Sequence, residues 1–154
     1  MIKKILILGL PGSGKTTLAR DLAPLLRAVH WNADAVRANI NSHLGFSAED
    51  RIEQARRMGW LCDQVVNSGH FAIADFVCPT KETREAFGEC FTVWVDTIKK
   101  GRFEDTNKIF EEPTRYDIKV NTQDSKFWAK AIYEELDYRI NPSLAKAMMI
   151  GMRI

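Results

Sequence analysis

Cysteine is scarce in this chain, and closely spaced cysteines are absent. The three cysteines, Cys62, Cys78 and Cys90, contain no C-x-x-C pair, so the sequence indicates neither a disulfide framework nor a zinc site. Isolated cysteines of this kind are typical of proteins in a reducing compartment, and we therefore expect a cytoplasmic location.

Long apolar runs and a strong net charge are missing too. No stretch reaches the length of about 18 apolar residues that a membrane-spanning helix needs, so no membrane association is expected. The apolar start, IKKILILGL, is too short for a signal peptide, has no small-residue cleavage site and continues into a glycine-rich loop. A formal net charge of +2 argues against nucleic acid as a partner, but it leaves room for a local basic cleft around a small polyanion.

The composition that is present is that of an ordinary globular protein. The chain has 154 residues, of which 45% are apolar and 27% charged. A chain of this length is expected to form one domain, over residues 1–154, and to bury roughly two-thirds of its unfolded surface. A core and a cleft are therefore both possible.

Short apolar runs alternate with helical patterns along the chain, which predicts an α/β fold with a parallel sheet of about five strands between helical layers. KILILG is expected to be a fully buried first strand, because a parallel strand covered on both faces is continuously apolar. The other expected strands lie in AVHW, HFAIADF, CFTVWVDT and YDIKVNT. Helices are expected at residues 15–26, 33–42, 47–69, 81–88 and 124–136, and a Met-rich helix after Asn141 and Pro142.

Two of these helices carry detailed expectations. Ser47 and Asp50 are predicted to form a capping box at the start of the 47–69 helix. Its inward stripe is expected at Ile52, Ala55, Gly59, Cys62 and Val66. The apolar face of the 124–136 helix is expected at Phe127, Trp128, Ala131, Ile132 and Leu136. Residues 99–113, KKGRFEDTNKIFEEP, are highly charged and predict a surface loop or frayed helix that is a candidate lid.

The stretch GLPGSGKTT matches the pattern G-x-x-x-x-G-K-[ST] completely, with a strand before it and a helix after it. Its backbone N–H groups and the helix start suit the phosphates of ATP, Lys15 is expected to reach the β- and γ-phosphates, and the Thr16 hydroxyl is expected to bind Mg²⁺. The pattern in this context predicts the fold of P-loop NTPases, a three-layer α/β/α sandwich. The predicted ATP-binding residues are Gly9, Pro11, Gly12, Ser13, Gly14, Lys15, Thr16 and Thr17.

A phosphate loop alone does not decide the reaction, because switches, motors and kinases share it. The guanine-recognition pattern Asn-Lys-x-Asp is broken here, since residues 107–110 read NKIF. Motor ATPases need a larger core, so a compact kinase is favoured. Asp34 follows a strand and is accompanied by Arg37, Phe46 and Arg51, which together suit an anionic acceptor with a ring to stack and a hydroxyl to activate. Arg56 and Arg57 are expected to form a solvated helix face.

The chain resembles adenylylsulfate kinases at these positions. The likeness runs from the phosphate loop through DAVR, Asn41, LGFSAEDRIEQARRMG and the CPT that ends at residue 80, and continues weakly through VDT and EEP. The resemblance implies transfer of a phosphoryl group from ATP to the 3′-hydroxyl of adenosine 5′-phosphosulfate. It also implies that Asp34 and Lys15 are catalytic and that nucleotides are the partners. Acceptor-binding residues are implied at Asp34, Arg37, Phe46, Arg51, Gln54, Cys78 and Lys108.

Asp75, at the end of the third expected strand, is a candidate Mg²⁺ ligand together with Thr16. Other interpretations stay open at this point. Asp34 is also suited to cap its helix, Phe46 to pack in the core, and Asp75 to form hydrogen bonds at a strand end. A lone lid arginine, Arg102, suits either the transferred phosphate or solvent.

The chain departs from the family pattern at several acceptor positions. It has Asn32 where the family usually has Asp, Gln54 in place of Asn and Cys78 in place of Ser, and its lid is shorter. Lys108 and Phe110 stand loosely for the family's lid lysine and aromatic residue. A kinase for another acceptor, such as a nucleoside monophosphate or a nucleic-acid 5′-hydroxyl, and a non-catalytic nucleotide-binding module therefore stay open as alternatives. The segment SLAKAMMIGMRI suits packing on the body or on a second subunit, as in a homodimer.

Overall fold

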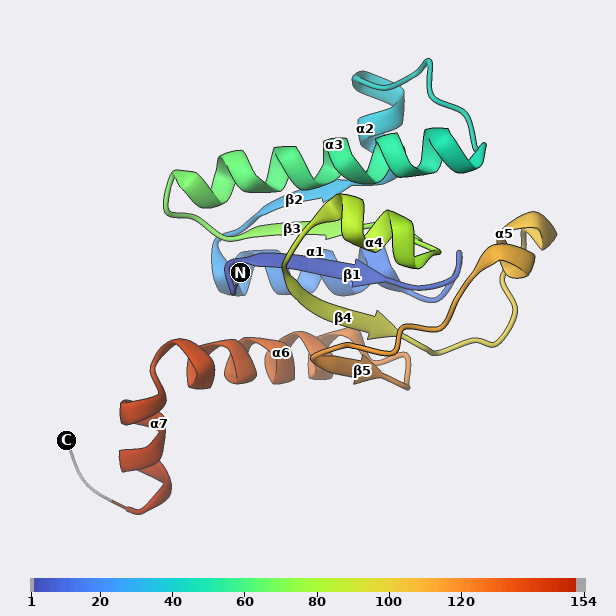
Figure 1. The fold of residues 1–154 in the computed structure, drawn as a ribbon. Coiled ribbons are helices and arrows are strands. Elements are labelled where there is room, and N and C mark those ends of the chain that lie inside the picture. The colour runs from blue at the N-terminus through green and yellow to red at the C-terminus, as the bar shows by residue number, and fades with distance from the viewer. Residues whose placement is uncertain (1, 152–154) are drawn as a thin grey trace.

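The computed structural model describes residues 2–151, and these form a five-stranded parallel sheet with helices on both faces (Figure 1). The strand order is β2-β3-β1-β4-β5, so the first strand lies at the centre. The strands are β1 (Lys4–Leu8), β2 (Val29–Asn32), β3 (Ala72–Asp75), β4 (Phe91–Val95) and β5 (Ile118–Val120). The predicted α/β class and the sheet of about five parallel strands are confirmed.

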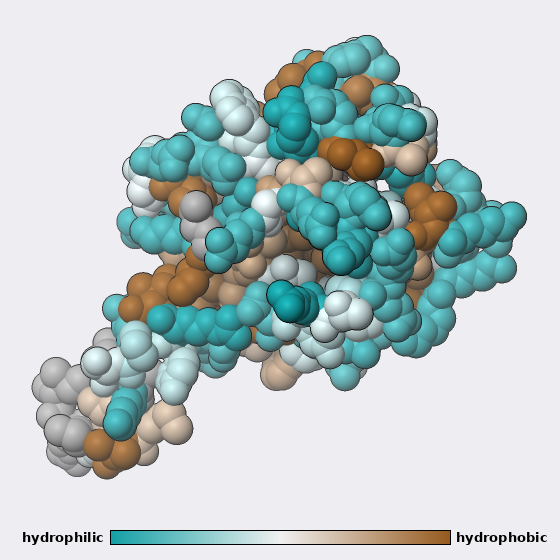
Figure 2. All heavy atoms as spheres, in the orientation of Figure 1, coloured by the Kyte–Doolittle hydropathy of each residue, from teal (hydrophilic) through white to brown (hydrophobic). Residues whose placement is uncertain are grey.

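The helices cover the sheet in two layers. In Figure 1, α3 and α4 lie on the near side of the sheet and α1 lies behind it, whereas α7 packs against α6 and extends away from the sheet, as Figure 2 also shows. No helix among residues 2–151 is long and apolar enough to cross a membrane. The helices are α1 (Lys15–Leu26), α2 (Ala33–Asn39), α3 (Ala48–Asn67), α4 (Lys81–Phe87), α5 (Glu104–Ile109), α6 (Ser125–Ile140) and α7 (Pro142–Met149).

Alternation along β1 builds the two halves of the core. Ile5 and Ile7 join a cluster with α1 and α6, whereas Leu6 and Leu8 join a cluster with α3 and α4 on the other face. Both faces of β1 are therefore buried in apolar core, which explains the continuous apolar run in the sequence. Lys4 is the buried exception in β1, and it is held by Phe87 O at 2.6 Å and by the Asp63 carboxylate at 2.9 Å.

Most predicted elements are present, but their details differ from expectation in three places. The Ser47 hydroxyl caps α3 as expected, yet the predicted capping box is wrong, because the Asp50 carboxylate accepts from Gly45 N at 2.8 Å instead. Ile52 is exposed, since the buried face of α3 runs through Gln54 and Met58. Phe127 of α6 is exposed as well and lies edge-on against its neighbour Trp128.

Helices also form in residues 99–113 and in the C-terminal part of the chain. Residues 99–113 carry the short helix α5, and α6 extends four residues beyond the predicted 124–136 range, to Ile140. The Met-rich terminal helix begins at Pro142 as expected, and residues 152–154 of that prediction lie outside the described residues. Because all five strands are parallel, the segments that follow β1, β2, β3 and β4 meet at one edge of the sheet. The predicted site residues follow those strands.

Candidate active-site cleft

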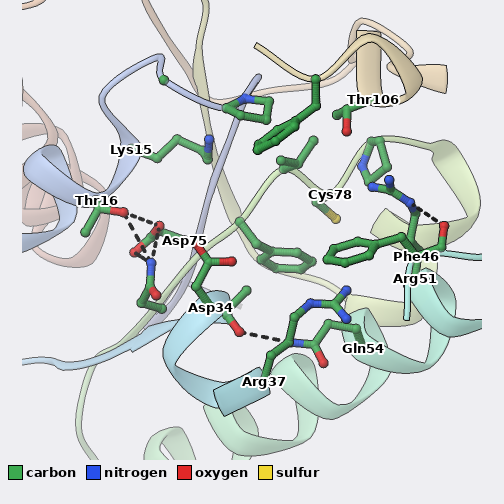
Figure 3. A pocket seen from close by; sticks show the side chains of 18 of the residues that line it. Lys15, Thr16, Asp34, Arg37, Phe46, Arg51, Gln54, Asp75, Cys78 and Thr106 are labelled. Atoms are coloured by element: carbon green, nitrogen blue, oxygen red, sulfur yellow. Dashed lines mark hydrogen bonds between the residues drawn. The ribbon is translucent and has the colours of Figure 1, made fainter. Parts of the chain in front are cut away.

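A cleft of about 560 Å³ opens at the carboxyl edge of the sheet. Its walls come from the phosphate loop, from α2 and the first turns of α3, from the segment after β3 and from residues 102–106 (Figure 3). The sequence-predicted residues that line it are Pro11, Gly12, Gly14, Lys15, Thr16, Thr17, Asp34, Arg37, Phe46, Arg51, Gln54, Asp75 and Cys78. Residues as far apart in the sequence as Pro11 and Cys78 therefore share one cavity.

The phosphate loop owes its shape to its glycines. Gly12 and Gly14 have φ values of 86° and 103°, which side-chain-bearing residues rarely adopt. A Cβ at Gly9 would lie 2.5 Å from Val95 O, so the start of the loop packs directly on the end of β4. Gly14 caps α1 without any side-chain hydrogen bond, which leaves the first N–H groups of the helix available to an anion.

Lys15 is 8% exposed and donates to Leu10 O at 2.9 Å. Burial lowers the pKa of its ammonium group from 10.5 to about 8, although the negative charges of Asp75 and then Asp34 act in the opposite direction. The positive charge of Arg102 also lowers the pKa of Lys15. Two cations and two carboxylates therefore face the same space, and a bound polyanion would stabilise the charged lysine.

Thr16 and Asp75 lie together as the sequence predicted. The Thr16 hydroxyl donates to Asp75 Oδ1 at 2.9 Å, and the Asn32 amide reaches both Asp75 oxygens at 3.2 and 3.3 Å. The other end of the Asn32 side chain accepts from Ala35 N and caps α2. The alternative in which Asp34 caps this helix is therefore wrong. Asp34 lies one position inside the helix start and lines the cleft instead.

The donor set around Thr16 fits Mg²⁺. A hydroxyl and a carboxylate are the hard oxygen donors that this ion prefers, and one or two carboxylates with bound phosphates and water usually suffice for it. Asp75 is 2% exposed, and its Oδ1 faces the Thr16 hydroxyl. Among residues 2–151 there is no group of three or more His, Cys, Asp and Glu side chains that could bind a metal without a ligand. A hydroxyl and one carboxylate leave the other positions around such an ion to phosphate oxygens and water.

Phe46 and two arginines form the far wall of the cleft. The Arg37 and Arg51 guanidinium groups lie over the Phe46 ring, 4.4 and 5.4 Å from its centre. Backbone carbonyls hold both arginines, since Arg37 Nη1 donates to Gly45 O at 2.8 Å and Arg51 Nε donates to Phe46 O at 3.0 Å. Burial and then the charge of Arg51 lower the pKa of Arg37, so the wall attracts anions. Phe46 is 65% exposed, and the core interpretation of this residue is therefore wrong.

Gln54 and Cys78 are buried residues that also line the cleft. Gln54 Oε1 accepts from Asn41 Nδ2 at 2.9 Å, and its Nε2 donates to Ala33 O at 3.4 Å (Figure 3). Cys78 adopts a φ of 45°, and its Sγ lies 3.6 Å from Thr83 Oγ1. Burial raises the pKa of the Cys78 thiol to about 12, so the thiol is not a nucleophile at neutral pH.

The 99–113 segment borders the cleft through Arg102, Phe103 and Thr106. Lys108 is exposed on α5 and is not among the residues that line the cleft. Phe110 lies 5.5 Å from the Arg84 guanidinium and packs against the α3 and α4 side of the core. Phe103 and Thr106 could not be predicted as cleft residues, because a charged loop has no periodicity that separates inward from outward positions.

Other predicted residues lie just outside the main cleft. Gly9 and Ser13 do not line it, and Ser13 borders a second cavity of about 300 Å³ on the other side of the phosphate loop. Arg56 and Arg57 both bind the Glu53 carboxylate. Arg56 is exposed, as expected for a solvated helix face, whereas Arg57 is half-buried and also donates to Asn41 Oδ1 at 2.9 Å. The second cavity is lined by Gly12, Ser13, Gly14, Thr17, Leu18, Val95, Thr97, Val120, Thr122, Gln123, Asp124, Ser125 and Trp128.

Known proteins match most of the chain. The sequence is 29% identical to the adenylyl-sulfate kinase of Gloeothece citriformis over 175 aligned positions, which cover 96% of this chain and 94% of that protein. It is 33% identical to the adenylyl-sulfate kinase of a Picosynechococcus strain over 72% of this chain and 62% of that protein. The match to the enzyme of Clostridium kluyveri reaches 43% identity but covers only 50% of this chain and 41% of that protein.

Solved structures share the fold. An APS kinase from Mycobacterium tuberculosis, in complex with AMPPNP and APS, superposes with a TM-score of 0.79 at 21% identity and covers 87% of this chain and 96% of that one. A hexameric APS kinase from Thiobacillus denitrificans gives 0.73 at 26% identity, over 88% of this chain and 29% of that one. The sequence profile of the family described as adenylylsulphate kinase matches residues 2–122. The chain therefore belongs to the adenylylsulphate kinase family.

Proposed function

We propose that this protein is an ATP-dependent kinase that phosphorylates a nucleotide-like acceptor, and that its acceptor is the 3′-hydroxyl of adenosine 5′-phosphosulfate. One observation carries the proposal. A single cavity joins the phosphate-loop residues Lys15 and Thr16 to Asp34 and to the Phe46 wall with its two arginines. A donor site and an acceptor site that open into one cleft are what direct phosphoryl transfer requires.

The donor half explains how the triphosphate would be held. The open N–H groups at the start of α1 and the Lys15 ammonium would surround the phosphates, and Thr16 and Asp75 would bind Mg²⁺. When bound, Mg²⁺ would offset negative charge on the phosphate oxygens. Arg102, whose charge acts on Lys15, would face the transferred group from the 99–113 segment, which would then serve as a lid. The second cavity, with Trp128 on its wall, suits the purine of the donor.

The acceptor half explains the chemistry. Arg37 and Arg51 would bind the phosphosulfate, and the exposed ring of Phe46 would stack on the adenine. Asp34 would accept the proton of the 3′-hydroxyl while the hydroxyl oxygen forms a bond to the γ-phosphorus. The bond between that phosphorus and the bridging oxygen breaks, and its electron pair leaves with ADP.

A panel of acceptors tests the proposal. Purified protein with ATP and Mg²⁺ would be supplied with adenylylsulfate, a set of nucleoside monophosphates or an oligonucleotide with a free 5′-hydroxyl, and ADP release would be followed. We expect release that depends on adenylylsulfate. Turnover with another acceptor alone would assign the cleft to that acceptor, an outcome that the changes at Asn32, Gln54 and Cys78 motivate. Tight ATP binding without turnover on any acceptor would indicate a nucleotide-binding module.

Asp34→Ala tests the proposed base. We expect this variant to lose about 10²- to 10⁴-fold in kcat, because the other carboxylate that lines the cleft, Asp75, would be occupied with Thr16 and Mg²⁺, while the variant's Kd for ATP changes little. A matched control is Glu49→Ala, which removes an exposed carboxylate from the first turn of α3. An Asp34→Ala variant with near wild-type kcat would show that Asp34 is not the base.

A further inference from the structure

His30 lies against the Asp75 carboxylate, a contact that the sequence did not predict. In the register between β2 and β3, Asn32 lies opposite Asp75 and His30 lies opposite Ile73. Residues two positions apart on a strand share a face, so His30 and Asn32 both project from β2 toward α1. Asp75 and Ile73 project from β3 on the same face, and Ile73 belongs to the core cluster that α1 covers. The register therefore brings an imidazole next to the carboxylate that faces Thr16.

The Asp75 carboxylate accepts from three side chains. His30 Nε2 forms a close hydrogen bond with Asp75 Oδ2, the Thr16 hydroxyl donates to Oδ1 at 2.9 Å, and the Asn32 amide bridges the two oxygens at 3.2 and 3.3 Å. The side chain of His30 is 17% exposed and that of Asp75 is 2% exposed. The contact to His30 is the closest of these contacts, and it is made to the oxygen that faces away from Thr16.

We propose that His30 is a positioning residue for the metal and phosphate half of the cleft: it fixes the rotation of the Asp75 carboxylate so that Oδ1 faces the Thr16 hydroxyl. This inference rests on the proposed use of Mg²⁺ and ATP, but not on the identity of the acceptor. Without His30, Asp75 Oδ2 keeps only the longer bond from Asn32. A carboxylate whose second oxygen keeps only this weaker contact turns more easily about its terminal side-chain bond, which has broad minima.

Asn32 connects the start of α2 to the Thr16 and Asp75 side chains. The Asn32 side chain caps α2 with its oxygen and donates from its nitrogen to Asp75 and to Thr16, at 3.2 Å in the latter case. An amide cannot carry negative charge, so Asp75 is the carboxylate that contacts Thr16 in this cluster. The orientation of this single carboxylate then decides how well the Thr16 site binds a cation.

The experiment measures ATP binding by calorimetry in Mg²⁺ and in EDTA, with no acceptor present. The variants are His30→Leu, which removes the donor, His30→Gln, which keeps an N–H group of similar reach, and the control His70→Leu on the exposed turn before β3. We expect Mg²⁺ to strengthen ATP binding by wild type. We expect His30→Leu to lose most of that enhancement, by about tenfold, while its affinity in EDTA changes less than about threefold. His30→Gln should recover much of the enhancement, and His70→Leu should equal wild type.

Retention of the full Mg²⁺ enhancement by His30→Leu would overturn the inference. Equal loss in Mg²⁺ and in EDTA would overturn it as well, since that result indicates a general structural role. If His30→Leu does not fold, His30→Asn replaces it, because its amide is too short to make the same contact to Asp75. Wild-type protein that binds ATP without any effect of Mg²⁺ would also contradict the inference. Failure to phosphorylate adenylylsulfate would leave these binding results unchanged, so the two proposals fail separately.

Discussion

The phosphate loop is built mainly from backbone, whereas the far wall of the cleft is built from side chains; this wall, which we propose binds the acceptor, is called the acceptor wall below. Residues 9–17 form one continuous turn whose shape depends on glycine backbone angles and on the start of α1. The acceptor wall draws separate side chains from α2, α3 and the segment after β3, and Phe46, Arg37 and Arg51 lie at its centre. Backbone recognises phosphate without regard to the rest of the ligand, whereas side chains recognise the shape of one acceptor.

The difference separates what is general in this cleft from what is specific. A phosphate loop tolerates many chemistries on its far side, since the same loop serves switches, motors and kinases. A change of one methylene group or one polar atom in the acceptor wall alters discrimination between ligands. Substitutions in the two regions should therefore have different kinetic signatures.

Lys15→Met should give the largest effect. We expect a loss of about 10²- to 10³-fold or more in kcat/KM, because a cation buried beside the phosphates is removed. Without bound nucleotide, Lys15→Met should nevertheless be more stable than wild type at neutral pH, by up to about 3 kcal/mol in the free energy of unfolding. The reason is that burial disfavours the charged lysine and lowers its pKa to about 8. Chemical denaturation and steady-state kinetics measure the two effects.

The stability difference should depend on pH in a defined direction. Below pH 8 the buried lysine is charged in both the folded and the unfolded state, so the folded protein is destabilised by the full free energy of burying that charge. Between about pH 8 and 10.5 the folded protein releases the proton first, wild-type stability rises and the gap to Lys15→Met narrows. Lys99→Met, at an exposed lysine of the 99–113 segment, is the control and should show no gap that closes in this window. A gap that widens with pH would contradict the burial argument.

The phosphate loop and the order of elements could be predicted because their determinants are local. The pattern from Gly9 to Thr17 specifies backbone angles, and the alternation of apolar runs specifies strands and helices. α1 begins and ends where the sequence predicted, at Lys15 and Leu26. The continuous apolar character of β1 similarly predicted that this strand is buried on both faces, and all five of its residues are buried.

Features that depend on long-range contacts could not be predicted. The contact between His30 and Asp75, which are 45 positions apart, forms only because of the register in which β2 pairs with β3. The contact of Asp50 with Gly45 depends on the path of the preceding turn, and the capping-box pattern could not distinguish the two partners. Thr106 rather than Lys108 lines the cleft, because the rotation of the short helix α5 is set by its attachment to the body.

Phe46→Ala should affect the acceptor side alone. A stacked base contributes about 1–3 kcal/mol to binding, so we expect the KM for adenylylsulfate to rise by about tenfold or more while the KM for ATP stays within about twofold. The control is Trp60→Ala, which removes another exposed aromatic side chain from α3, outside the cleft. An equal rise in both KM values would remove the distinction between a general donor loop and a specific acceptor wall.

Cys78→Ser should give the smallest effect and tests how finely the acceptor wall discriminates. The substitution restores the residue type that adenylylsulfate kinases usually have at this position. The new hydroxyl is close in size to the thiol, and Thr83 Oγ1, 3.6 Å from Cys78 Sγ, remains as a hydrogen-bonding partner. We therefore expect the KM for adenylylsulfate to change by less than about threefold and the KM for ATP not at all. A tenfold fall in the acceptor KM would instead show that this buried position, rather than Phe46 and its two arginines, limits how well the wall binds its ligand.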